Sequence, residues 1–332
     1  MLPFLESEFG NPNSIHSLGQ RARYAVERAR THVAELIGAE DPSQVIFTSG
    51  ATEGNNQVLS SYPNGAVSPF EHSTVREPAA AFGLELLGSE DLLIIPPKKP
   101  FELISCMTVN NEIGTIWHPG QLNYSAEHVH SDITQAVGKI PIDLTNLSFA
   151  TFSGHKFFGP KGVGGLYIES TAPKVLFFGG EQESHVRAGT LNVAGIVGMG
   201  AAAQIASDEL DSSYAQAKKL RNIVLEGLDG TADFFVNGGL DVSPYILSLS
   251  FDGVEGETLV IEMDHAGYAI SSGAACSSGS TEPSHVLTAL GIDQGFLRGT
   301  VRVSFGRFCS NESASGLSKS LRHAVDLLRR MH

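Results

Sequence analysis

The chain has 332 residues and a formal net charge of −14, with 42% hydrophobic and 17% charged residues. This length supports a large core and two subdomains, and the composition is ordinary for a folded enzyme. The acidic balance disfavours a nucleic-acid-binding surface, no run of 18 apolar residues predicts a membrane span, and the N-terminus lacks the order of a signal peptide.

The first part of the chain alternates predicted helices and strands. An amphipathic helix is expected over 16–38, a short strand over 44–50 and a helix from 51. Further strands are expected over 92–95, 103–109, 126–131, 149–153 and 163–168. This alternation predicts an α/β fold with a mainly parallel sheet. Only 16 residues, 110–125, join two of the strands, so we expect a connection there that is poor in helix.

The character of the chain changes from about Ser207. A long polar helix is expected over 207–228, and the segments that follow are predicted as sheet and covering helices. We therefore divide the chain into a large domain, 1–206, and a smaller α+β domain, 207–332. Strands are expected over 233–238, 245–253 and 300–306, and helices over 257–267, 283–291 and 314–331.

The three cysteines, Cys106, Cys276 and Cys309, lie far apart in the sequence. No CxxC pair is present, so neither a zinc site nor a disulfide framework is predicted, and a reducing cytoplasm is the natural compartment. Cys276 stands in the Ser/Gly-rich stretch SSGAACSSGS, which provides neither an apolar packing environment nor a second metal ligand. This setting fits a thiol on a mobile loop.

The segment FATFSGHKFFGPKG carries the strongest chemical signal. Lys156 follows an apolar strand and is flanked by Phe157 and Phe158, and an apolar neighbourhood lowers the pKa of a lysine. A neutral lysine amine forms a Schiff base with an aldehyde. A surface lysine is the alternative for this residue taken alone.

The residues around Lys156 predict a pyridoxal phosphate site. Ser153 and His155 are candidate phosphate donors, and Ala51 and Thr52 stand at a strand-to-helix turn, where free N–H groups favour an anion. Asp132, at the end of a strand, is a candidate partner for the pyridine nitrogen. A helix N-cap for Asp132 and an ordinary glycine turn before Ala51 are the structural alternatives.

Eight motifs in order resemble those of the cysteine desulfurases, which are class V aminotransferase-like enzymes of fold type I. They are FTSGATEGNN, EHSTV, VNNEIGTI, SDITQAVGKIPID, SGHKFFGPKG, RAGTLN, SSGAACSSGSTEPSHVL and VRVSFGRF. The resemblance spans most of the chain. It implies a large domain with a mainly parallel, seven-stranded type of sheet, a smaller domain that carries the catalytic cysteine loop, and pyridoxal 5'-phosphate as the cofactor.

The resemblance also implies roles for individual residues. Lys156 binds the cofactor aldehyde, and Cys276 takes the sulfur as a persulfide. Asn111 and Arg302 contact the substrate carboxylate, for which Arg307 is a rival. The remaining roles fall to residues around the cofactor: Asp132 at the pyridine nitrogen, Gln135 at the ring hydroxyl, His72 stacked on the ring and active in acid–base steps, Ala51, Thr52, Ser153 and His155 at the phosphate, and Thr190 at the phosphate of the other subunit of a homodimer.

The resemblance implies that the sulfur passes from Cys276 to an acceptor, either an iron–sulfur scaffold protein or a tRNA-thiolation protein. A selenocysteine lyase, an aminotransferase on the same fold and an inactive scaffold partner remain open alternatives. In the resembling proteins a short segment precedes the residues that match MLPFL and helps to close the active site. We expect its lack here to affect activity rather than the fold.

Overall fold

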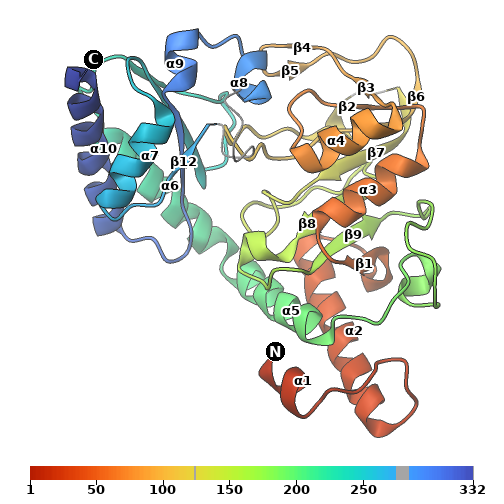
Figure 1. The fold of residues 1–332 in the computed structure, drawn as a ribbon. Helices are drawn as coiled ribbons and strands as arrows, with labels where there is room; N and C mark the ends of the chain where they lie inside the picture. The colour runs from red at the N-terminus through yellow and green to blue at the C-terminus, as the bar shows by residue number, and fades with distance from the viewer. Residues whose placement is uncertain (123–124, 274–283, 332) are drawn as a thin grey trace. The chain divides into compact units, whose positions relative to one another are not determined.

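The computed structural model describes residues 1–122, 125–273 and 284–331 (Figure 1). They form two compact units, which are described separately here. Unit 1 comprises 1–88, 96–108 and 117–210, and unit 2 comprises 89–95, 109–116 and 211–332. The division at 210 lies close to the boundary expected at 206. The two short segments that join unit 2 from within the first half of the chain were not expected.

Unit 1 is built on a seven-stranded sheet in the order β1-β9-β8-β7-β6-β2-β3. The four pairings from β8 to β3 are parallel, whereas β9 is antiparallel to both β8 and β1. The predicted mainly parallel sheet is thus confirmed. Its strands are β1 (Val45–Thr48), β2 (Gly65–Val67), β3 (Glu85–Leu86), β6 (Phe101–Ser105), β7 (Ala126–Asp132), β8 (Phe149–Ser153) and β9 (Gly164–Ile168).

Three neighbouring strands of the sheet are buried along their whole length. Every residue of β1, β8 and β9 is buried, as expected for a sheet whose two faces are both covered. In the view of Figure 1, α3 and α4 lie in front of the sheet, and α2 packs along α5. The helices are α1 (Leu2–Glu6), α2 (Ser17–Ile37), α3 (Ala51–Ser61), α4 (Ser73–Phe82) and α5 (Val193–Asp208), with 3-10 turns η1 (Pro42–Gln44), η2 (Pro119–Gln121), η3 (Gly154–Phe157) and η4 (Glu183–His185).

The connection from β6 to β7 confirms one expectation from the sequence. Among its described residues it contains only the short turn η2, although the two strands are parallel neighbours. The strand expected over 92–95 was placed wrongly in the main sheet. Leu93–Ile94 forms β5, which pairs with β4 (Ser89–Glu90) in a separate antiparallel hairpin.

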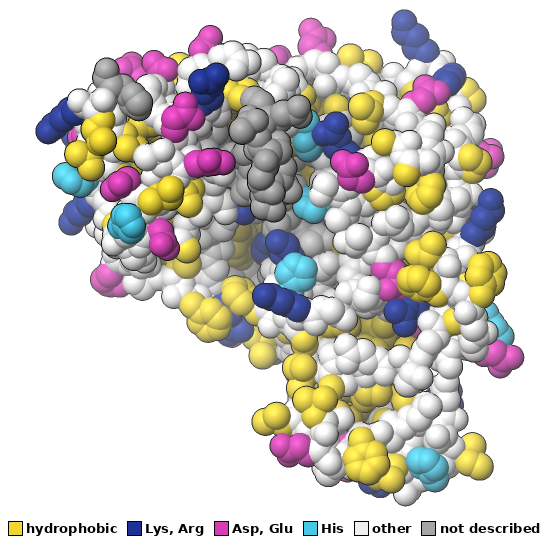
Figure 2. Space-filling view, in the orientation of Figure 1, with side chains coloured by type: hydrophobic (Ala, Val, Ile, Leu, Met, Phe, Trp, Pro, Cys, Tyr) yellow, Lys and Arg dark blue, Asp and Glu magenta, His cyan; other side chains and the backbone are white. Residues whose placement is uncertain are grey.

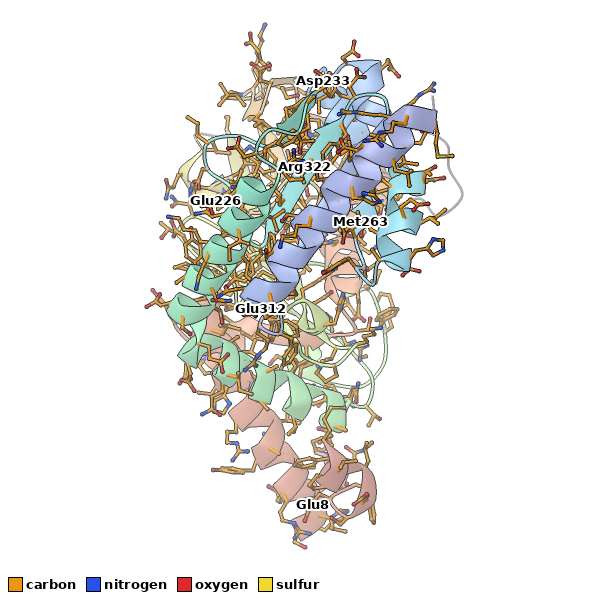
Figure 3. All side chains as sticks on the ribbon, turned by 90° about the vertical axis from the view of Figure 1, so that its left-hand side faces the viewer. Glu8, Glu226, Asp233, Met263, Glu312 and Arg322 are labelled. Carbon is orange, nitrogen blue, oxygen red and sulfur yellow. The ribbon has the colours of Figure 1, made fainter. Side chains whose placement is uncertain are left out.

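Unit 2 is a four-stranded antiparallel sheet, β10-β11-β13-β12, covered by helices. The 21-residue α10 packs against α7, and in Figure 3 it runs next to α6, with Arg322 on α10 near Glu226 on α6. The elements are α6 (Leu210–Gly227), β10 (Phe234–Val236), β11 (Ile246–Phe251), α7 (Gly256–His265), β12 (Ser271–Ser272), α8 (His285–Ala289), α9 (Gln294–Arg298), β13 (Thr300–Ser304) and α10 (Asn311–Met331).

An apolar cluster forms the interior of unit 2. Leu321 and Val325 of α10 are fully buried against Phe251 of β11 and Leu220 of α6. The strong segregation of apolar and polar residues along α10 explains why this amphipathic helix forms over one face of the sheet. No helix in the described part of the chain is both long enough and apolar enough to span a bilayer.

Candidate cofactor site

Lys156 lies in the turn η3, three residues beyond the end of β8. Phe157 is buried, whereas Lys156 is exposed and Phe158 is 55% exposed. The apolar neighbourhood predicted for Lys156 is therefore present on one side only. Gly154 fixes the start of this turn, because a Cβ there would come within 2.9 Å of Met199 Sδ. The backbone that presents the lysine therefore leaves little room for a side chain at this position.

The N-terminus of α3 lies beside Ser153. The helix begins after Gly50 without a side-chain cap, and the Ala51 N–H donates to Ser153 Oγ over 2.9 Å. The Ser153 hydroxyl keeps its own hydrogen for an acceptor, and Thr52 in the same turn is exposed. Free N–H groups at a helix start favour an anion, so this corner suits a phosphate.

His155 stands beside the same corner among positive charges. Partial burial and the charges of Lys156, Lys161 and Lys139 lower its pKa. A phosphate bound among these lysines would offset their mutual repulsion. The residues predicted to bind phosphate therefore occur together in unit 1.

Asp132 is the last residue of β7 and is 5% exposed. Its Oδ2 accepts from Asn55 Nδ2 over 3.0 Å, and its Oδ1 accepts from the Thr134 N–H over 2.9 Å. The buried hydroxyl of Thr134 has no partner among the described residues. A buried carboxylate and an unpartnered hydroxyl at a strand end fit a polar ligand such as a pyridine ring with its substituents.

His72 precedes α4 and caps it. Its Nδ1 accepts from the Thr74 N–H over 3.2 Å and lies 3.0 Å from Thr74 Oγ1. Asn55 Nδ2 lies 3.1 Å from the same Thr74 hydroxyl. The Asn55 amide therefore bonds to Asp132 directly and is linked to His72 through Thr74. The structure thus brings these two predicted site residues together.

Gln135 is half-buried in the turn that follows β7. Its Oε1 accepts from Lys139 Nζ over 2.7 Å. The predicted bond from Gln135 to a ring hydroxyl remains a prediction.

Thr190 is exposed on a loop that two ion pairs hold to the body of unit 1. Glu183 is buried and binds Arg30 through both carboxylate oxygens, at 2.8 and 2.9 Å, and it accepts the Phe47 N–H. Glu53, in the first turn of α3, binds Arg187 over 2.8 Å. These pairs fix the loop at Glu183, the first of three successive residues with positive φ, and at Arg187, two residues beyond the last.

Pairing shifts the pKa values of Arg30 and Glu53. Burial by itself would lower the pKa of Arg30, but the hydrogen bond and the charge of Glu183 outweigh burial and hold the pKa above its ordinary value. Burial would likewise raise the pKa of Glu53, and the bonds from Arg187 and Ser49 lower it instead. Arg30 and Glu53 are therefore ionised at neutral pH.

Unit 2 brings together Asn111 and Arg302, the two residues predicted to contact the substrate carboxylate. Arg302 Nη1 donates to the Asn111 carbonyl over 2.7 Å, and Nη2 donates to Ser271 Oγ over 3.2 Å. The buried Nε of Arg302 has no partner among the described residues. This N–H is available to an anion.

Cys276 lies outside the described residues. The residues on each side of 274–283 are anchored within unit 2. Ser271–Ser272 pairs with β13, and Ser284 caps α8 and donates to the Glu112 carboxylate.

Sequence reasoning missed several polar residues that are buried next to Asp132. His130, Ser105 and Thr151 occupy neighbouring strands, and Glu71 directly precedes His72. Burial lowers the pKa of His130 to about 4, although Asp132 acts in the opposite direction. Burial raises the pKa of Glu71 to about 8, with a further contribution from Asp132, against the bond from the Met107 N–H. Polar residues at alternate positions of apolar strands were the available signal.

The sequence model of the class V aminotransferases matches residues 1–78 and 96–317. The cysteine desulfurase IscS of Dictyoglomus turgidum is 38% identical over 360 residues, covering 99% of this chain and 91% of that protein. IscS of Klebsiella pneumoniae is 38% identical over 366 residues, covering 99% and 87%.

Solved structures of similar proteins indicate the same family. A NifS-like protein is 31% identical with a TM-score of 0.87, over 98% of this chain and 94% of that one. A NifS-like protein from Rickettsia africae is 25% identical with a TM-score of 0.88, over the same shares. The chain therefore belongs to the class V aminotransferase family, within which its sequence relatives are cysteine desulfurases.

Proposed function

We propose that this chain is a pyridoxal phosphate-dependent cysteine desulfurase, which converts cysteine to alanine and passes the sulfur to an acceptor. One observation supports the cofactor site above all. Helix α3 contacts both ends of the site, because Ala51 bonds to Ser153 on the lysine strand and Asn55 bonds to Asp132. Phosphate and pyridine partners are thereby fixed on one rigid element.

Pyridoxal phosphate, when bound, supplies an electron sink for the α-carbon of the substrate. In this proposal, the Lys156 amine would hold the cofactor aldehyde and, when free, would move protons on the substrate. Asp132 holds the pyridine nitrogen protonated, His72 stacks on the ring and assists proton transfer, and Gln135 bonds to the ring hydroxyl. Asn111 and Arg302 bind the substrate carboxylate, for which a guanidinium offers a two-pronged contact.

Sulfur transfer is assigned to Cys276. Its thiolate attacks the substrate sulfur, so that an S–S bond forms while the C–S bond breaks. The electron pair of the broken bond stays with the substrate carbon, which takes a proton and leaves as alanine. A persulfide remains on Cys276, and a thiol of the acceptor, an iron–sulfur scaffold or a tRNA-thiolation protein, takes its outer sulfur.

The test uses the full chain with added pyridoxal phosphate and cysteine, and it measures alanine, sulfide and protein-bound persulfide. Lys156→Ala should lose the absorbance of the lysine-bound cofactor and all alanine formation. Cys276→Ala should keep that absorbance and lose persulfide, and Cys309→Ala is the matched control. Turnover of selenocysteine but not of cysteine would favour a selenocysteine lyase. Transamination without persulfide would favour an aminotransferase, and the absence of any turnover would favour an inactive scaffold.

A homodimer in which Thr190 binds the phosphate of the other subunit is part of the proposal. Two observations favour it. Thr190 is exposed on a loop held by two ion pairs, and large apolar side chains are exposed close to it in sequence and within the first 24 residues of the chain (Figure 2). They are Leu2, Leu5, Phe9, Ile15, Tyr24, Phe177 and Phe178.

Mixed dimers test the role of Thr190. In a dimer of one Lys156→Ala and one Thr190→Ala subunit, a shared site arrangement places both defects in one site and leaves the other intact. Activity should therefore rise above that of either variant alone. If Thr190 serves its own subunit, each site keeps one defect and mixing restores nothing.

A cytoplasmic location completes the proposal. Cys106 and Cys309 are free thiols, and the Cys276 nucleophile must be reduced before each turnover. A reducing compartment meets both conditions.

A further inference from the structure

Five buried side chains form a continuous line of hydrogen bonds that ends at Asp132. Ser105 Oγ lies 2.8 Å from His130 Nδ1, and His130 Nε2 lies 3.2 Å from Thr151 Oγ1. Thr151 Oγ1 bonds to Asn55 Oδ1 over 2.5 Å, and Asn55 Nδ2 bonds to Asp132 Oδ2 over 3.0 Å. The line crosses β6, β7 and β8 and reaches α3 (Figure 1).

The direction of every bond follows from the carboxylate. An ionised Asp132 can only accept, so the Asn55 amide must turn its NH₂ toward it and its oxygen toward Thr151. The single hydrogen of the Thr151 hydroxyl then goes to Asn55. Thr151 must therefore accept from His130, whose proton lies on Nε2, and His130 Nδ1 accepts from the Ser105 hydroxyl. Every donor thus points toward Asp132.

A branch of the same network reaches His72. Asn55 Nδ2 also lies within reach of Thr74 Oγ1, and the Thr74 hydroxyl and N–H both face His72 Nδ1. Because His72 Nδ1 accepts from that N–H, its proton belongs on Nε2. One amide therefore contacts Asp132 directly and His72 through Thr74.

We propose that Asn55, Thr151 and His130 are positioning residues of a one-way hydrogen-bond relay, which orients the Asp132 carboxylate and fixes the Nε2–H tautomer of His130. Aligned donors polarise one another, so the relay strengthens the hydrogen bond from Asn55 to Asp132. The direction of the line depends on Asp132 Oδ2 remaining an acceptor. The link to catalysis rests on the proposed function, because Asp132 is the predicted partner of the cofactor nitrogen.

The titratable groups that face Asp132 support this arrangement. His130 and Glu71 are fully buried, and burial keeps both of them neutral near pH 7. The Asp132 carboxyl therefore faces two neutral groups. A charge buried among neutral groups requires donors, and the relay together with the Thr134 N–H provides them.

The first experiment reads the relay directly. Nitrogen NMR of ¹⁵N-histidine-labelled holoenzyme, with His130→Gln to assign the signal, should show the His130 proton on Nε2 and no titration between about pH 6 and pH 8. A proton on Nδ1, or a titration in this range, would overturn the proposal. This readout needs no turnover, so it holds even where the activity assay fails.

The second experiment cuts the line while keeping its shape. Thr151→Val keeps the size of the side chain and removes the hydroxyl, whereas Thr151→Ser keeps the hydroxyl. We expect Thr151→Val to lose the His130 tautomer preference and to weaken pyridoxal phosphate binding about tenfold or more, as for a lost bond in a charged network. Thr151→Ser should stay close to wild type in both measurements. Equal cofactor affinity and equal His130 tautomer in the two variants would refute the proposed relay.

Ser105→Ala is the milder cut at the far end of the line. Its matched control is Ser131→Ala, since the Ser131 hydroxyl on the same strand as His130 bonds to Thr108 instead. We expect wild type and Ser131→Ala to bind the cofactor with the highest affinity, Ser105→Ala with a lower affinity and Thr151→Val with the lowest. Wild-type protein that binds no cofactor would refute the cofactor assignment and leave the tautomer test standing.

Discussion

The interiors of the two units are held together by different means. Unit 2 closes around an apolar cluster that includes Leu220, Phe251 and Leu321. Unit 1 also has an apolar cluster, between the sheet and α3 and α4, but the carboxyl ends of its strands bury carboxylates, histidine and amides. Truncating a side chain in an apolar interior lowers the free energy of unfolding in proportion to the cavity that it leaves. Removing one partner from a buried polar network lowers it further, because the remaining polar groups lose their hydrogen bonds. The predictions below test this difference.

The largest effect is expected from Arg30→Ala in unit 1. The change leaves the buried Glu183 carboxylate without its partner and should lower the free energy of unfolding by about 3–5 kcal/mol. Urea denaturation measures it, with Glu27→Gln as the control for the exposed neighbour of Arg30. A double change of Arg30 and Glu183 to Met should recover only part of the loss, because the Phe47 N–H and the Val45 carbonyl would still lack their partners. A loss below about 1 kcal/mol in the single variant would contradict the polar description of unit 1.

Leu321→Ala tests the apolar interior of unit 2. Leu321 is fully buried in the cluster, so its truncation should cost about 3 kcal/mol from lost burial and the cavity left behind. Leu327→Ala, on the same helix but 40% exposed, is the matched control and should cost much less. Similar urea midpoints for the two variants would show that α10 does not bury its apolar face as described.

Glu71→Gln should change how stability depends on pH. The folded protein keeps the Glu71 proton up to about pH 8, while an unfolded glutamic acid loses it near 4.5, so stability falls as pH rises across this window. His130 acts in the opposite direction only below about pH 6.5. Between about pH 6.5 and 8.5 the urea midpoint of wild type should therefore fall, and that of Glu71→Gln should stay level.

The exposed residue Glu77 provides the control for this measurement. Glu77→Gln should follow wild type at every pH. A level wild-type profile between about pH 6.5 and 8.5 would show that Glu71 is ionised in the folded protein.

The smallest effect is expected from Lys99→Gln. Lys99 and Glu85 form an ion pair in unit 1 in which both side chains are more than half exposed. Its loss should change the free energy of unfolding by less than about 1 kcal/mol, and added salt should reduce even that. Set beside Arg30→Ala, this variant separates the effect of burial from the effect of pairing.

Much of the fold could be predicted from the sequence because its local patterns are strong. Alternating helices and apolar strands predicted the sheet of unit 1, and the spacing of 110–125 predicted a connection with little helix. The hairpin of β4 and β5 was missed, because a short apolar run does not show which strand it pairs with.

The site was predicted less completely, for a physical reason. Lys156, Asp132 and the start of α3 stand in local motifs, whereas Asn55, Thr151 and His130 acquire their roles only through contacts across three strands and a helix. The exposure of Lys156 and Phe158 likewise depends on the turn after β8. Tertiary contacts of this kind have no signature within a single stretch of chain.

Helix α3 crosses β8 so closely that Gly54 touches a member of the relay. A Cβ on residue 54 would come 2.8 Å from Thr151 Cγ2 and push that side chain away from Asn55. Serine at 151 would keep the hydroxyl and give up the methyl group, and so make room. Positions 54 and 151 therefore form a pair that is expected to change together during evolution, with a side chain at 54 admitted only after the methyl at 151 is lost.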